Sequence, residues 1–243
     1  MDRAVLTVSY GVRRVDEIRK SVAPVEKAIA KAVPGCALFR SFACKEGVDA
    51  LRQAGEEAHL FGESLVALKN SGYKDIGVVP LFIAPGEVYK RIQETATGLP
   101  VSGPLLNTED DLERIADIYG EIARDSGRKV LLMGHGSPGC GDENYMRLAQ
   151  VLPSHVHLAC RRGVLSLDSV LPRLDARRDN ILLMPLMLSA GRHAGEEMAG
   201  EGPDSWKSIL EKRGFDVRVR LDGMGSLPCI QRMFADKALA AME

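Results

Sequence analysis

The feature that most constrains the fold is an internal repeat. In each half of the chain an apolar run ends in Pro-Leu and reaches a glycine soon after: residues 76–86 read IGVVPLFIAPG and residues 181–191 read ILLMPLMLSAG. Each half also holds an earlier apolar run that ends at a glycine, VLTVSYG at 5–11 and VLLMGHG at 130–136. Segments that recur in the same order indicate a duplicated structural unit. We therefore expect two similar lobes, residues 1–125 and 126–243.

Each expected lobe alternates strands with helices. The β-rich runs are short, and between them apolar residues recur every three or four positions, as in amphipathic helices. This order is typical of parallel sheets covered by helices, so the expected fold class is α/β. The expected strands are 4–9, 37–42, 76–83, 129–133, 156–160, 180–188 and 215–221, and the expected helices are 12–32, 57–71, 86–97, 108–126, 144–152, 167–174, 205–213 and 228–242.

Composition and the absence of several motifs exclude some classes of function. The 32 Lys and Arg residues balance 33 Asp and Glu residues, so no basic excess exists to bind nucleic acid. No apolar run approaches the ~18 residues of a membrane helix, and the first residues lack the pattern of a signal peptide, so we expect a cytoplasmic protein. The chain has no GxxxxGK[ST] phosphate loop, and no nucleotide cofactor is expected. The five cysteines form no CxxC pair, which argues against a cysteine zinc site.

Two histidines follow strands that belong to the repeat. His135 lies between Gly134 and Gly136, and His193 follows the second Pro-Leu strand. Open parallel sheets bind ligands beyond the carboxyl ends of their strands, and flanking glycines allow a ligand to approach closely. The residues alone leave two alternatives of similar weight. The histidines either form a ligand site or are hydrogen-bonded structural residues.

Two other pairs of polar residues are better explained as structural or solvated residues than as parts of a ligand site. His155 and His157 alternate along a strand, so their side chains share a face. A pair of hydrogen-bonded histidines is favoured there over a metal site. The Glu196-Glu197 pair is interpreted as solvated helix charge.

A longer pattern around the two histidines resembles a known family. It runs from MGHG at 133–136 to MPLMLSAGRHA at 184–194, MAG at 198–200 and PDSWKSILE at 203–211, and it includes VSYG at 8–11, PGEVY at 85–89 and GMG at 223–225. This pattern covers nearly the whole chain and resembles the anaerobic cobalt chelatases of cobalamin biosynthesis. Members of that family are class II chelatases, lyases that insert a metal into sirohydrochlorin without ATP.

The resemblance implies a chelatase-like fold with the active site in a cleft between the two lobes. It implies that His135 and His193, both in the lobe 126–243, bind the metal substrate and accept pyrrole protons. Imidazole is a suitable ligand for Co²⁺, Ni²⁺ and Fe²⁺. Glu87 is implied as a secondary base or as a carboxylate on the path of the metal. The implied substrate-binding positions are Tyr10, Gly11, Tyr89, Ser137 and Arg162. The expected partner is a tetrapyrrole, and homo-oligomerisation is left open.

This chain departs from the family at three positions. Arg162 stands where the family carries a glutamate metal ligand, Val88 where a second glutamate follows Glu87, and Phe82 where some members carry histidine. An arginine cannot ligate a metal, but it can pair with a substrate carboxylate or lie solvated at the surface. Two alternatives to metal insertion therefore stay open. One is a tetrapyrrole-binding or carrier protein, and the other is an enzyme that acts on a different tetrapyrrole, including metal removal.

Overall fold

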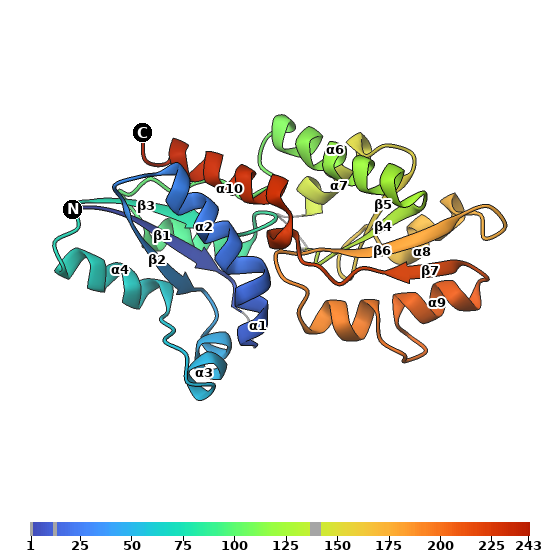
Figure 1. The fold of residues 1–243 in the computed structure, drawn as a ribbon, viewed down its shortest axis with the longest axis horizontal. Helices are drawn as coiled ribbons and strands as arrows, with labels where there is room; N and C mark the ends of the chain where they lie inside the picture. Colours follow the sequence, from blue (N-terminus) through green and yellow to red (C-terminus); the bar gives the residue numbers. More distant parts are fainter. Residues whose placement is uncertain (1, 12–13, 137–141) are drawn as a thin grey trace. The chain divides into compact units, whose positions relative to one another are not determined.

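The structure is a computed structural model that describes residues 2–11, 14–136 and 142–243. The chain forms two compact α/β units (Figure 1). Unit 1 consists of residues 1–105 and 225–243, and unit 2 consists of residues 106–224. Both sheets are parallel throughout the described strands, which confirms the α/β class that the repeat and the alternation predicted.

Unit 1 contains a three-stranded parallel sheet in the order β2-β1-β3. Its strands are β1 (Arg3–Ser9), β2 (Ala37–Phe42) and β3 (Asp75–Pro80). Helices α4 and α5 cover one face, where residues such as Leu6, Leu65 and Ile92 form a buried cluster. Helices α2 and α10 cover the other face (Figure 1). The helical segments are α1 (Val15–Glu17), η1 (Ile18–Val22), α2 (Ala23–Ala32), α3 (Lys45–Gln53), α4 (Phe61–Asn70), α5 (Glu87–Thr95) and α10 (Pro228–Ala240).

Unit 2 contains a four-stranded parallel sheet in the order β5-β4-β6-β7. Its strands are β4 (Lys129–Gly134), β5 (Val156–Cys160), β6 (Asn180–Leu186) and β7 (Asp216–Val219). Leu131, Leu183 and Trp206 belong to the buried cluster between one face of the sheet and the helices that follow β5 and β6. The helical segments are α6 (Glu109–Ser126), α7 (Asp142–Val151), α8 (Leu167–Val170), η2 (Leu171–Arg173), η3 (His193–Met198), α9 (Trp206–Lys212) and, at the return to unit 1, η4 (Met224–Ser226).

The division between the units differs from the expected boundary near residue 125. Helix α6 packs on β4 and β5 and belongs to unit 2, whereas the last helix, α10, packs on α2 and β3 and belongs to unit 1. Both helices have the apolar stripe that any sheet-covering helix needs. The stripe specifies that a helix is covered on one side, but not which of two similar sheets it covers, so the sequence placed both helices in the wrong lobe.

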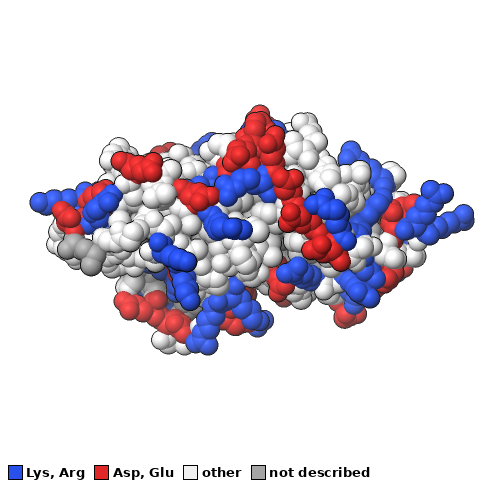
Figure 2. Space-filling view, turned by 45° about the horizontal axis from the view of Figure 1, so that its top comes forward, with Lys and Arg blue, Asp and Glu red and all other residues white. Residues whose placement is uncertain are grey.

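Helix α6 shows clearly how sequence fixes a local structure. Thr108 is its N-cap and accepts a hydrogen bond from the Asp111 backbone amide at 3.1 Å, and Gly127 ends the helix with a left-handed φ of 63°. Its outer face carries acidic residues at a spacing of four: Glu109, Glu113, Asp117 and Glu121. Figure 2 shows this band of acidic side chains over α6 with Lys and Arg side chains beside it. All four side chains are exposed, so this face of α6 is in contact with solvent.

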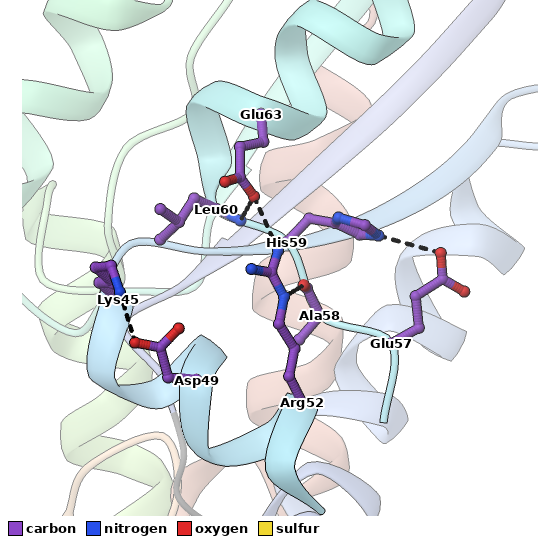
Figure 3. Close-up of polar contacts among 8 residues, drawn as sticks. All are labelled: Lys45, Asp49, Arg52, Glu57, Ala58, His59, Leu60 and Glu63. Atoms are coloured by element: carbon purple, nitrogen blue, oxygen red, sulfur yellow. Dashed lines mark hydrogen bonds and ion pairs between the residues drawn. The ribbon is translucent and has the colours of Figure 1, made fainter. Parts of the chain in front are cut away.

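The connection from α3 to α4 is held by a small polar network (Figure 3). Arg52 donates to the Ala58 carbonyl at 2.8 Å and to Glu63 at 3.1 Å, and Glu63 accepts the Leu60 amide at 3.0 Å. His59 pairs with Glu57 at 3.1 Å on the surface, in agreement with the exposed position expected for it. Over the described residues, no helix combines the length and the apolar character needed to cross a membrane.

Candidate metal site

The strand order of unit 2 predicts where its sheet would bind a ligand. The chain passes from β4 to β5 on one side and then crosses to β6 on the other side of β4, so the strand order reverses between β4 and β6. Crevices at such reversals, beyond the carboxyl ends of the strands, are where open α/β sheets bind ligands. His135 directly follows β4, and His193 begins η3 after β6. The two strand-end histidines of the repeat are therefore brought to the same edge.

The two imidazole rings lie close enough to bind one ion. Their centroids are 5.6 Å apart and the rings meet edge to face at 68°. The Nδ1 atom of His135 lies 2.8 Å from the Gly136 carbonyl oxygen, and Nδ1 of His193 lies 2.5 Å from Oε1 of Glu197. A carbonyl and a carboxylate only accept hydrogen bonds, so each Nδ1 carries the hydrogen. In its neutral form, each ring then keeps a lone pair on Nε2, the atom that can bind a metal or accept a proton.

The glycines beside His135 are required by close packing. A Cβ atom on Gly134 would lie 2.9 Å from Cys160 Sγ, and one on Gly136 would lie 1.9 Å from the Arg162 carbonyl oxygen. Gly136 also has a left-handed φ of 73°. The Gly-His-Gly sequence thus allows the loop after β4 to lie directly against the loop after β5. Desolvation raises the pKa of the Cys160 thiol to about 12, so this cysteine is a packed side chain and not a nucleophile.

A largely buried arginine holds the carboxylate that contacts His193. Arg161, with 12% of its side chain exposed, donates from Nε and Nη2 to the two oxygens of Glu197 at 2.8 and 2.9 Å. Hydrogen bonds from Arg161 and then from His193 hold the pKa of Glu197 down to about 2. The interpretation of Glu197 as solvated helix charge is therefore wrong. The signal in the sequence was the spacing of four between His193 and Glu197, which places both side chains on one side of a helical turn.

The backbone of Arg162 lies against the loop that carries His135, and the expected role of its side chain at the substrate cleft stays a prediction. Its side chain is exposed and makes no hydrogen bond or ion pair with the described residues, while its carbonyl packs against Gly136. Partial desolvation and then the positive charges of Arg161 and Arg162 lower the pKa of His135 below the ordinary value of imidazole. His135 is therefore neutral at physiological pH, the state in which it can bind a metal or take a proton.

Within the part of the chain that the structure describes, no third metal ligand joins the histidine pair. Among residues 2–11, 14–136 and 142–243, no group of three His, Cys, Asp or Glu side chains is arranged to hold an ion. A metal bound by two imidazoles would keep coordination positions for water or for a second ligand.

Comparison with known proteins identifies the family. Residues 3–243 match the sequence model of the family described as Cobalt chelatase (CbiK). The chain belongs to the cobalt chelatase family. It is 30% identical over 248 residues to the sirohydrochlorin cobaltochelatase of Salmonella typhimurium, an alignment that covers 96% of this chain and 94% of that protein.

Two further comparisons agree with this membership. The chain is 35% identical over 186 residues to the sirohydrochlorin cobaltochelatase CbiKC of Nitratidesulfovibrio vulgaris, which covers 70% of this chain and 66% of that protein. The solved structure of DR2241 from Deinococcus radiodurans, described as a multi-domain protein with structural similarity to chelatases, superposes with a TM-score of 0.63 at 17% identity. This chain is covered completely in that comparison and spans 56% of the length of DR2241. That likeness supports the chelatase-like fold.

Unit 1 explains two of the departures from the chelatase pattern. Val88 and Phe82 are partly buried and pack against the apolar cluster between the sheet and helices α4 and α5. Both positions therefore contribute to the core and supply no metal ligand. Glu87, the first residue of α5, has 80% of its side chain exposed and lies 3.4 Å from Lys90. Its implied role as a base or metal-guiding carboxylate stays a prediction.

The other residues implied in substrate binding differ in their exposure. Tyr10 is 57% exposed after β1, and Gly11 has a φ of 142° that favours glycine. Tyr89 is buried and its hydroxyl donates to the Ser102 carbonyl at 3.1 Å, so this side chain supports the fold of unit 1. Ser137 lies outside the described residues. The expected location of the macrocycle between the two lobes stays a prediction, since the described site belongs to unit 2 alone.

The second histidine pair forms no metal site in the described structure. His155 Nε2 lies 3.3 Å from the Gly120 carbonyl oxygen and is a hydrogen-bonded structural residue, as the sequence favoured. His157 Nε2 is buried and has no hydrogen-bond partner among the described residues, so the expectation of a hydrogen-bonded pair is wrong for His157. Burial lowers the pKa of His157 to about 4, so it is held neutral within the fold.

Proposed function

We propose that this chelatase inserts Co²⁺ into sirohydrochlorin, or a closely related tetrapyrrole, without ATP. The observation that carries the proposal is the pair of imidazoles 5.6 Å apart at the carboxyl edge of the sheet, each with Nδ1 bonded and Nε2 free. The family and the names of the two sirohydrochlorin cobaltochelatases support both the metal and the macrocycle. Ni²⁺ and Fe²⁺ are further metals that imidazole ligands accept.

The proposed chemistry exchanges a metal for two protons. The metal-free macrocycle loses two pyrrole N–H protons, and the divalent cation takes the place that those protons leave. His193, held by Glu197, keeps a fixed orientation and is the steadier of the two metal ligands. His135 is neutral because its pKa lies below the ordinary value, so it can bind the metal first and accept one pyrrole proton at Nε2 once the metal has moved to the ring, while Nε2 of His193 accepts the second proton.

The loop after β5 supplies the proposed contacts to the macrocycle. Arg162 and Val164 are both exposed on this loop, and 63% of Val164 is accessible. An arginine can pair with a carboxylate at the edge of the ring, and a valine can pack on its apolar face. Tyr10, which is exposed in unit 1, is proposed as a second apolar contact. Gly11, Tyr89 and Ser137 are retained as substrate-binding positions only by the resemblance.

One observation favours a second function. The positive charge of Arg162 acts on His135, where the family carries an acidic metal ligand. A cation at this place weakens the binding of a bare divalent metal and strengthens the binding of an anionic macrocycle. The second candidate is therefore a tetrapyrrole-binding or carrier protein, or an enzyme that acts on a different tetrapyrrole or removes its metal.

An absorbance titration separates these functions. Sirohydrochlorin is mixed with the protein first alone and then with Co²⁺, and the spectrum is followed against a protein-free control. Insertion at a rate well above the control, lost in a His135→Ala, His193→Ala variant, supports the chelatase. A spectral shift that reports binding, with insertion no faster than the control, supports the carrier and rejects the chelatase. Release of metal from cobalt-sirohydrochlorin would support removal.

A further inference from the structure

The strand-end loop after β5 and the helix after β6 are linked by one charged network. Arg161 forms a two-pronged contact with Glu197, and Glu197 contacts Nδ1 of His193. The Arg161 backbone is itself fixed, since its amide donates to the Gly134 carbonyl at 3.0 Å. The network therefore connects the ends of three adjacent strands, β5, β4 and β6, to a single imidazole.

We propose that the Arg161–Glu197 pair is a positioning device that fixes His193 in the tautomer with hydrogen on Nδ1, so that Nε2 faces the metal. Only the metal-binding part of this proposal rests on the function proposed above. Outer groups that hydrogen-bond a ligating histidine set its tautomer and orientation, and their removal commonly weakens metal binding by about 10- to 100-fold. Arg161 and Glu197 do not touch the metal and act through His193.

The surroundings of the pair distinguish it from an ordinary surface ion pair. The side chain of Arg161 is 12% exposed, and both oxygens of Glu197 are engaged. A planar guanidinium that bonds both oxygens of a carboxylate also fixes the direction of that carboxylate, which a single charge on lysine cannot do. Exposed ion pairs such as Arg192 with Glu196, 3.9 Å apart on the same helical segment, have no such constraint.

The same geometry opposes a direct role of Glu197 as a ligand. Oε1 accepts from Arg161 at 2.9 Å and from His193 at 2.5 Å, and Oε2 accepts from Arg161 at 2.8 Å. A metal bound to either oxygen would have to displace hydrogen bonds from a charged and mostly buried donor. Glu197 consequently supports the ligand, whereas Arg162 is the residue that aligns with the family's acidic ligand in sequence.

The test measures the tautomer and the metal affinity separately. Histidine-selective ¹⁵N NMR of the metal-free protein is recorded in mildly alkaline buffer, and the His193 signals are assigned by their loss in His193→Asn. Co²⁺ affinity is measured by its visible absorption. The variants are Glu197→Gln, Arg161→Met and Arg161→Lys, and the matched control is Glu196→Gln, which alters the neighbouring, exposed carboxylate.

The expected result is an unprotonated Nε2 of His193 in the wild type and in Glu196→Gln. In Glu197→Gln and Arg161→Met, the tautomers should mix and Co²⁺ affinity should fall about 10- to 100-fold, with partial recovery in Arg161→Lys. An unchanged tautomer in Glu197→Gln overturns the inference, even if Co²⁺ affinity falls, because Glu197 would then act as a ligand. A fixed tautomer in a wild type that inserts no metal would reject the proposed function and leave the inference standing.

Discussion

The carbonyl oxygen of Arg162 occupies the space that a side chain on Gly136 would need. A Cβ atom at residue 136 would lie 1.9 Å from that oxygen, and the backbone of Gly136 has a φ of 73°. The contact joins the loop that carries His135 to the loop that carries Arg161 and Arg162. The geometry of the histidine pair therefore depends on a glycine that makes no contact through a side chain.

Gly136→Ala should reduce both stability and metal binding. The left-handed backbone and the backbone contact together should lower the free energy of unfolding by about 2–4 kcal/mol. Co²⁺ affinity should fall because the His135 loop must move away from the Arg162 loop. Urea unfolding and a Co²⁺ titration measure the two effects. Gly62→Ala in helix α4, where a Cβ meets open space, is the control and should raise stability by about 0.5–1 kcal/mol. Equal effects of the two substitutions would contradict the argument.

Arg162→Glu should change the binding of metal and macrocycle in opposite directions. An exposed charge near the site interacts through solvent, so a change of about 1 kcal/mol is expected, which corresponds to about fivefold tighter Co²⁺ binding and weaker binding of metal-free sirohydrochlorin. Both affinities are measured by absorbance at two salt concentrations, because higher salt should reduce the effect. Arg177→Glu makes the same charge change on the exposed turn before β6. If Arg177→Glu matches Arg162→Glu, the effect is one of net charge and Arg162 has no local role.

His157 should make the fold less stable in mild acid. Burial, followed by the charges of Lys129 and Arg173, lowers its pKa from 6.5 to about 4, against the opposing effect of Asp179. Between pH 6.5 and pH 4 the unfolded chain binds the extra proton, so the free energy of unfolding falls as the pH falls through this range. The loss should reach about 2 kcal/mol once partial exposure is allowed for.

His157→Leu should remove most of that loss. The buried Nε2 atom of His157 has no hydrogen-bond partner in the described part of the chain, and a leucine side chain in the same position would need none. Denaturant unfolding at pH 7, 5.5 and 4.5 should show a flatter curve for the variant than for the wild type. Some pH dependence should remain, because the pKa of His135 is also lowered. A variant as acid-sensitive as the wild type would show that His157 is not the cause.

An ion pair in unit 1 joins a buried carboxylate to a partly exposed arginine, and removal of only one partner should be costly. Glu26, with 6% of its side chain exposed, is paired with Arg40 through both oxygens and accepts a hydrogen bond from Thr7 at 2.9 Å. Glu26→Ala leaves Arg40 without its partner and should lower the free energy of unfolding by about 3 kcal/mol. The double variant Glu26→Met, Arg40→Met should recover most of the loss in urea unfolding. A double variant as unstable as the single one would show that packing, and not the orphaned charge, determines the cost.

Local sequence patterns predicted most of the elements of the fold. Strand β2 and strand β5 have the expected bounds, and Thr108 and Gly127 delimit α6 as capping residues do. Helix α3 (Lys45–Gln53) was not predicted, because its nine residues include Gly47 and lie close to the apolar run of β2. The proline in each repeated strand was expected at its carboxyl end, and Pro80 is indeed the last residue of β3.

The sequence by itself determined the parallel α/β class, the repeat and the two strand-end histidines. These depend on local periodicity and on the rule that parallel sheets bind ligands at their carboxyl ends. Only the tertiary structure decided that α6 covers the second sheet and α10 the first, and that Arg161 and Glu197 support His193. The residues 161 and 197 lie on different strand-end segments, and no local pattern encodes a contact between them. Their pairing follows from strand order, which is fixed when buried surfaces from distant parts of the chain pack together.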